Sequence, residues 1–168
     1  ITRTFPVNGQ FTGPQASIYD IVLEAQTEAI KSIAPGKSYN TANDVTIKTI
    51  TQGLVDLGIL SGDIDDLVES GLYRDFYMHQ SGHWLGMDVH DVGDYRLDQI
   101  WRDYEAGMVV TVEPGIYISP DNLKVEEKWR GIAVRIEDNV VLTRNGCEQL
   151  TENVPKCRVE IEKLMNCL

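Results

Sequence analysis

The sequence has few cysteines, no long apolar run and no excess of positive charge. Its three cysteines, Cys147, Cys157 and Cys167, contain no Cys-x-x-Cys pair. This argues against a disulfide framework or a zinc finger and favours reduced thiols in a cytoplasmic protein. No apolar segment approaches the roughly 18 residues of a membrane span, and the first residues lack the apolar core of a signal peptide.

The charge balance is strongly acidic. Fifteen Lys and Arg residues against 26 Asp and Glu residues give a formal net charge of −11. Because such a surface repels nucleic-acid phosphates and anionic lipids, we expect neither nucleic acid nor a membrane as a partner. Two interpretations of the acidic excess stay open here: it serves solubility, or some of the carboxylates bind cations.

The hydrophobic pattern predicts helices first and strands later. The expected helices cover residues 12–33, 41–57, 61–69 and 155–165. The expected strands cover residues 1–7, 108–118 and 132–143. Pro114-Gly115 interrupts the second strand-like run, and Asn145-Gly146 predicts a hairpin turn after the third. This order favours an α+β domain over alternating βαβ units, and 168 residues suit one domain.

All three histidines fall within twelve residues, at His79, His83 and His90. The spacing of His79 and His83 would put both rings on one helix face, as in a zincin. However, the catalytic glutamate of that motif is replaced by Gln80, and glycines such as Gly82 weaken a helix. We therefore expect an irregular strand or loop. Each histidine alone has a simple structural interpretation, whereas clustering with carboxylates would indicate a site.

Two glutamates stand among apolar residues of the predicted strands. Glu113 ends a run of valines, and Glu137 follows Ile136. A carboxylate in such surroundings is costly to bury unless it is paired or binds a cation. Strand alternation puts Thr111 on the face of Glu113 and Arg135 on the face of Glu137. Without a cation, Glu113 would be an edge-strand surface residue and Glu137 would pair with Arg135.

Five sequence motifs occur in an order typical of one known family. They are Ile1-Thr2-Arg3-Thr4-Phe5-Pro6, Met78-His79-Gln80-Ser81-Gly82-His83-Trp84-Leu85-Gly86, Asp88-Val89-His90-Asp91-Val92-Gly93, Thr111-Val112-Glu113-Pro114-Gly115 and Arg135-Ile136-Glu137-Asp138. Over nearly its whole length the chain resembles the C-terminal part of Xaa-Pro aminopeptidases. The resemblance implies the pita-bread fold, an α+β domain whose curved, mainly antiparallel sheet holds two divalent metal ions.

The same resemblance implies the site residues and their roles. The implied metal ligands are His83, Glu113 and Glu137. The residues implied to line the substrate site are His79, His90 and Arg135. In this scheme Glu113 also accepts the proton of the attacking water, His79 stabilises the developing oxyanion, His90 contacts the proline side, and Arg135 orients Glu137. A mostly carboxylate donor set with one imidazole suits manganese, cobalt or zinc, and we expect manganese.

The family pattern also contains two aspartate ligands that precede the present segment. The nearer one immediately precedes the stretch that here begins at Ile1. Residues 1–168 are therefore expected to be a partial catalytic domain that lacks an N-terminal domain and the first part of the catalytic domain. Since half of the expected carboxylate ligands are then missing, this chain alone is expected to be inactive and to bind metal weakly or not at all.

The implied reaction is dinuclear metal-dependent hydrolysis of the N-terminal Xaa-Pro bond of peptides with proline second. His83-Trp84 resembles the aminopeptidase form, because prolidases more often carry His-Phe. A homo-oligomer is expected. The alternatives are a prolidase acting on Xaa-Pro dipeptides, a creatinase, and a non-catalytic pita-bread domain that binds peptides or proteins.

Overall fold

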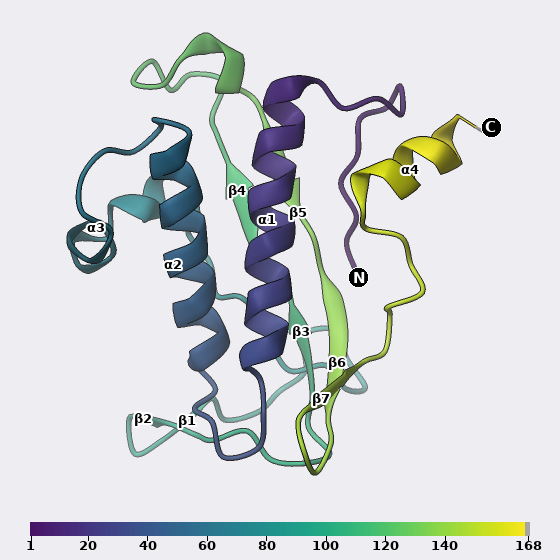
Figure 1. The fold of residues 1–168 in the computed structure, drawn as a ribbon. Helices are drawn as coiled ribbons and strands as arrows, with labels where there is room; N and C mark the ends of the chain where they lie inside the picture. The colour runs from purple at the N-terminus through teal and green to yellow at the C-terminus, as the bar shows by residue number, and fades with distance from the viewer. Residues whose placement is uncertain (167–168) are drawn as a thin grey trace.

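The computed structural model describes residues 1–166, in which two long helices pack side by side on short antiparallel strands (Figure 1). The long helices are α1 (Gly13–Ser32) and α2 (Thr41–Asp56). The shorter helices are α3 (Ile64–Ser70) and α4 (Arg158–Met165). Single 3₁₀ turns cover Leu72–Asp75 and Glu127–Trp129. α4 lies near the N-terminus, on one side of the strand layer (Figure 1).

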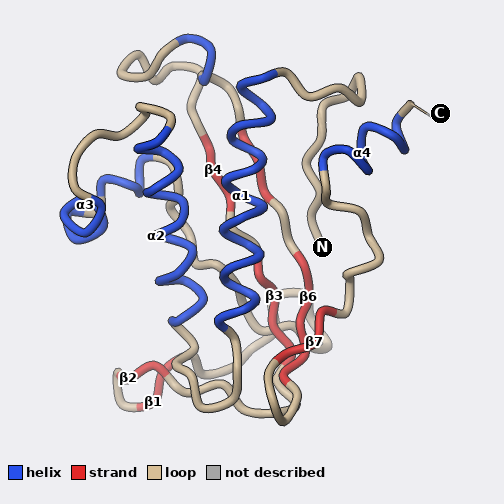
Figure 2. The backbone as a smooth tube through the Cα atoms, viewed as in Figure 1, coloured by secondary structure: helices blue, strands red, loops and turns tan. Residues whose placement is uncertain are grey.

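The strands form one long broken ribbon and a small separate hairpin. They are β1 (Arg96–Leu97), β2 (Ile100–Trp101), β3 (Val109–Val112), β4 (Gly115–Tyr117), β5 (Ala133–Arg135), β6 (Asp138–Leu142) and β7 (Cys147–Gln149). All pairings are antiparallel: β1 with β2, β3 with β6, β6 with β7, and β4 with β5. β4 continues from β3 and β6 from β5, with a break in each at the same level (Figure 2).

The helices follow from local signals and then bury their apolar faces. The Thr12 hydroxyl accepts from the Gln15 main-chain nitrogen, and the Gln15 side chain accepts from that of Thr12, which forms a capping box at the start of α1. Gly53 of α2 lies so close to the Ile21 side chain that a Cβ would not fit. This close approach lets α1 and α2 share one apolar core with the inner face of β4 and β5.

Most of the predicted elements are confirmed. The four helices occur where the apolar periodicity placed them, although α3 starts at Ile64. The strand-like runs 108–118 and 132–143 are each split in two, and Asn145-Gly146 connects β6 to β7. The prediction of a strand over residues 1–7 is wrong: only Thr2 forms an isolated bridge, with Glu137. A strand needs a partner along its length, and local alternation cannot supply one.

Two further expectations concern helices and cysteines. Within residues 1–166 no helix is both long and apolar enough to cross a membrane. Cys147 and Cys157 are free thiols, as expected, whereas Cys167 lies outside the described residues.

Candidate metal centre

The breaks in the ribbon place two carboxylates next to each other. Glu113 directly follows β3 and Glu137 directly precedes β6, and the strand register pairs Val112 with Asp138. Both glutamates are 8% exposed, so the alternative of a surface position for Glu113 is wrong. One ligand atom from each glutamate and one from His83 all lie within 4.8 Å of one another. The structure thus brings together the three predicted ligands.

Main-chain hydrogen bonds hold the His83 loop against β3. The Glu113 nitrogen donates to the Ser81 carbonyl at 2.6 Å, and the Thr111 nitrogen donates to the His83 carbonyl at 3.0 Å. The His83 nitrogen donates to the Thr111 hydroxyl at 3.0 Å. Gly82 lies between these contacts, where a Cβ would overlap the Thr111 carbonyl oxygen. The expected irregular strand or loop is confirmed, and it fixes His83 beside Glu113.

The His83 ring is oriented to offer a lone pair to the centre. Its Nδ1 lies 2.8 Å from the Trp84 carbonyl oxygen, which can only accept, so Nδ1 carries the hydrogen. In the neutral ring Nε2 then has a free lone pair, and it faces Oε1 of Glu113 at 3.2 Å. Metal-binding histidines almost always donate through their other nitrogen in this way.

Arg135 contacts Glu113 instead of Glu137. Its Nη1 lies 3.2 Å from Oε2 of Glu113. Within residues 1–166 the alternative ion pair between Arg135 and Glu137 is therefore not formed, and the role of Arg135 in orienting Glu137 stays a prediction. Since Gly115 pairs with Arg135, Glu113 is a diagonal neighbour across the ribbon and within reach of a long side chain.

Tyr117 joins Arg135 to His79 and was missed by the sequence analysis. The Arg135 Nε donates to the Tyr117 hydroxyl at 2.7 Å, and that hydroxyl lies 2.8 Å from Nε2 of His79. Nδ1 of His79 is 2.8 Å from the Gln80 carbonyl oxygen. Because that oxygen only accepts, Nδ1 holds the hydrogen and Nε2 accepts from Tyr117. Alternation along the strand, which puts Tyr117 on the face of Gly115, was the signal available.

Burial favours the neutral forms of the Tyr117 hydroxyl and the His79 imidazole in this hydrogen-bonded network. Burial raises the pKa of the Tyr117 hydroxyl, with the Glu113 charge adding to it, although Arg135 opposes the rise. Burial also lowers the pKa of His79 below its ordinary value of 6.5. At neutral pH both nitrogens of His79 are thus occupied. The role of His79 as an oxyanion donor stays a prediction, and it requires one of these contacts to break.

Thr2 is a second residue that sequence reasoning missed. Its hydroxyl donates to Oε2 of Glu137 at 2.5 Å, and the Glu137 nitrogen donates to the Thr2 carbonyl at 3.0 Å. The Thr4 hydroxyl donates to the Arg135 carbonyl at 2.9 Å, so both threonine hydroxyls face the ribbon. Only the pairing of the chain start with residues 135–137 reveals this function of Thr2.

His90 lies beside His83 at the exposed edge of the centre. Their ring centroids are 4.3 Å apart in an edge-to-face arrangement. A cavity that borders His83 is lined by Tyr39, Gln80, Gly82, His83, Tyr95, Arg96 and Trp101. Three aromatic side chains and the Arg96 guanidinium thus border the cavity next to the ligand His83.

The donor set fits a divalent cation. Two buried carboxylates and one imidazole converge, and Arg135 compensates only one of the two negative charges directly. A buried carboxylate pair with this residual charge is costly without a cation between its members. Oxygen donors with one imidazole suit manganese, cobalt and zinc.

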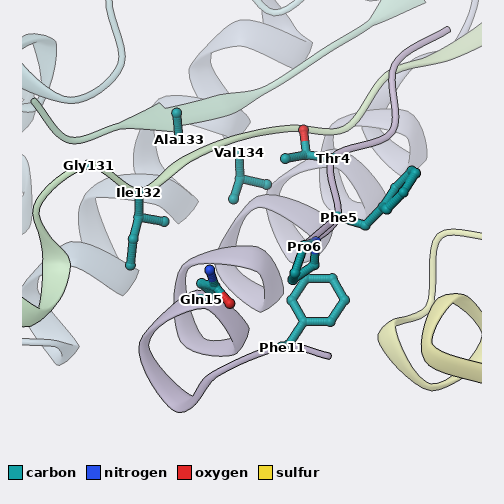
Figure 3. Close-up of a pocket in the computed structure, with 9 residues that line it drawn as sticks. All are labelled: Thr4, Phe5, Pro6, Phe11, Gln15, Gly131, Ile132, Ala133 and Val134. Atoms are coloured by element: carbon teal, nitrogen blue, oxygen red, sulfur yellow. The ribbon is translucent and has the colours of Figure 1, made fainter. Parts of the chain in front are cut away.

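A second pocket, shown in Figure 3, lies outside this centre. It is bordered by Thr4, Phe5, Pro6, Phe11, Gln15, Gly131, Ile132, Ala133 and Val134. None of these side chains is titratable. This pocket therefore offers no carboxylate, imidazole or thiolate, and no side chain that could act as a general acid or base.

Comparisons with known proteins identify the family. Residues 1–144 match metallopeptidase family M24. The chain is 59% identical over 166 residues to an Xaa-Pro aminopeptidase of Haemophilus influenzae, with coverage of 99% of this chain and 38% of the relative. It is 52% identical over 165 residues to an Xaa-Pro aminopeptidase of Escherichia coli, with coverage of 98% and 37%.

Solved structures give the same result for the fold. Aminopeptidase PepP of Pseudomonas aeruginosa superposes with a TM-score of 0.98 at 60% identity, covering 99% of this chain and 38% of that chain. Zinc-substituted E. coli aminopeptidase P in complex with product gives a TM-score of 0.94 at 51% identity, with the same coverage. The α+β pita-bread prediction is confirmed, and the chain spans about 38% of the length of these relatives. The chain belongs to metallopeptidase family M24.

Proposed function

We propose that this chain forms part of the catalytic domain of an aminopeptidase that hydrolyses the N-terminal Xaa-Pro bond with two divalent metal ions. The observation that carries the proposal is the convergence of His83, Glu113 and Glu137 to within 4.8 Å. We infer manganese as the metal, with cobalt or zinc as alternatives, because carboxylate oxygens dominate the donor set. The identity to Xaa-Pro aminopeptidases supports the substrate class.

The bound ions would supply Lewis-acid activation of a water and of the scissile carbonyl. In this proposal Glu113 would accept a proton from the attacking water. One of its oxygens is held by Arg135 at 3.2 Å, so the other stays directed at His83. Tyr117 in turn holds the Arg135 guanidinium, which limits the rotation of the whole arrangement.

The substrate would enter beside His83 and His90. An Xaa-Pro bond is a tertiary amide without an N–H, so the site needs no acceptor at that nitrogen. The aromatic walls of Tyr39, Tyr95 and Trp101 fit an apolar pyrrolidine ring or neighbouring side chain. The Arg96 guanidinium lies 4.1 Å from the centroid of the Trp101 ring, which keeps a positive charge at the edge of the cavity beside His83.

The main-chain nitrogen of Ile1 lies 3.8 Å from Oε2 of Glu137, so the start of the described chain borders the centre. We also propose a cytoplasmic, homo-oligomeric enzyme; the free thiols of Cys147 and Cys157 suit a reducing compartment.

The test uses protein expressed from the complete open reading frame and supplied with manganese. Xaa-Pro peptides of three or more residues should be hydrolysed, and matched Xaa-Ala peptides should not. His83→Ala should abolish turnover while the circular dichroism spectrum is retained. Glu148→Gln, at an exposed carboxylate of β7, is the control and should keep full activity.

The other outcomes would overturn either the ligand assignment or the proposed function. Activity retained in His83→Ala would overturn the ligand assignment. Cleavage restricted to dipeptides such as Gly-Pro would indicate a prolidase. Peptide binding without cleavage by the manganese-loaded protein would indicate a binding domain.

A further inference from the structure

A fully buried carboxylate lies directly behind the metal centre. Asp138 is 0% exposed and neighbours Glu137 in the chain. Its Oδ1 accepts hydrogen bonds from Arg3 at 2.7 Å and Thr151 at 2.6 Å. Its Oδ2 accepts from Gln26 at 2.9 Å, Gln149 at 2.7 Å and Lys156 at 2.7 Å. Five donors from distant parts of the chain thus converge on one side chain.

This network is more elaborate than charge neutralisation of Asp138 requires. Burying a carboxylate is costly, and one cation with a few neutral donors would compensate it. Here two cations, Arg3 and Lys156, both contact it. Of these two cations, Arg3 also donates to the main-chain carbonyl of Glu137.

Arg3 links Asp138 to the main chain of the metal centre. Its Nη2 donates to Asp138, while its Nη1 donates to the Glu137 carbonyl at 2.6 Å and the Thr2 carbonyl at 3.0 Å. The same guanidinium donates to the carbonyls of Val154 and Pro155 at 2.9 and 3.0 Å. A planar group engaged at all three nitrogens has one orientation, which fixes Thr2 against Glu137.

The two consecutive carboxylates point in opposite directions. Successive side chains of a strand alternate, so Glu137 faces the centre while Asp138 faces the interior. The Thr2 hydroxyl then holds Oε2 of Glu137 at 2.5 Å. Movement of the Thr2 main chain would therefore rotate the Glu137 carboxylate, because that hydroxyl is its direct hydrogen-bond partner.

We infer that Asp138 is a positioning residue for the metal centre, acting through Arg3 and Thr2 to orient the ligand Glu137. The inference rests on the proposed function, since it assigns Asp138 a role in that same site. Changes in the hydrogen-bond partners of a metal ligand commonly weaken metal binding by roughly 10- to 100-fold. A purely structural Asp138 would lower stability and leave the metal affinity of the folded protein unchanged.

The experiment compares Asp138→Asn with wild type, both from the complete open reading frame and stripped of metal. Calorimetry with manganese alone gives the dissociation constant, and the melting temperature of the metal-free protein is measured separately. We expect the dissociation constant of Asp138→Asn to rise roughly 10- to 100-fold. Asp20→Asn is the control: this exposed carboxylate of α1 pairs with Arg158 at 2.6 and 2.7 Å, and its loss removes the same charge.

A second pair of variants decides the outcome if Asp138→Asn does not fold. Thr2→Val removes the hydroxyl that holds Glu137 and leaves the buried network in place. It should raise the dissociation constant in the same direction, and Thr2→Ser should recover most of the lost affinity. An unchanged manganese affinity in Thr2→Val, or in a folded Asp138→Asn with a lower melting temperature, overturns the inference alone. Wild-type protein that binds none of manganese, cobalt and zinc refutes the proposed function itself.

Discussion

Replacing Gly82 by alanine tests how the histidine loop is held on β3. A Cβ at this position would overlap the carbonyl oxygen of Thr111, which is main chain and cannot rotate away. The loop and the strand must then separate by roughly 1 Å to reach ordinary van der Waals distance. The separation would occur between two hydrogen bonds, from Glu113 to Ser81 and from Thr111 to His83.

The expected effect has a stability part and a functional part. Each of the two main-chain hydrogen bonds contributes about 0.5–1.5 kcal/mol, so Gly82→Ala should destabilise the fold by about 1–3 kcal/mol. His83 moves with the loop, away from Glu113, to which it is now 3.2 Å distant. A displacement of about 1 Å in a catalytic geometry lowers the rate by roughly 100-fold.

Urea denaturation measures the loss of stability. Manganese calorimetry and turnover of an Xaa-Pro peptide measure the effect on the metal centre. Gly13→Ala is the control, because Gly13 starts α1 with no atom near its would-be Cβ. The control should be neutral or slightly stabilising, since alanine is the better helix former. Wild-type stability and manganese affinity in Gly82→Ala would refute the close approach between loop and strand.

Three further predictions concern the core, His79 and the isolated chain. Leu54→Ala, at a fully buried side chain of α2, should lower the free energy of unfolding measured in urea by about 2–5 kcal/mol. Leu123→Ala, at an exposed position, should change that free energy by less than about 0.5 kcal/mol. Equal effects of the two substitutions would contradict the packing. The His79 ring should titrate below 6.5 by NMR, so stability is lost as pH falls from 6.5 towards the lower folded-state pKa; a pKa above 6.5 would contradict its burial. Residues 1–168 alone should bind manganese weakly, because Glu113 and Glu137 supply only part of the expected charge compensation; tight binding of two ions in calorimetry would contradict this.

The sequence motifs predicted the three metal ligands, whereas the hydrogen-bond and ion-pair partners of these residues were visible only in the structure. His83, Glu113 and Glu137 were predictable because a specific residue order resembles one family. The partner of Arg135 was not, because strand alternation puts Arg135 and Glu137 on one face without telling which strand lies opposite. The register of β4 with β5 brings Glu113 closer to Arg135, and this register is a long-range property.

The sequence by itself determined the helices, the hairpin after β6 and the kinds of donor at the metal centre. The helices and the hairpin depend on apolar periodicity and turn residues, which are local properties of the sequence. The donor types follow from the order of motifs, which resembles that of a known family. Only the tertiary structure decided that Thr2 holds Glu137, that Tyr117 joins Arg135 to His79, and that residues 1–7 form a single bridge. The reason is physical: a hydrogen bond between residues far apart in the chain depends on how all the intervening segments pack, and no local pattern encodes that distance.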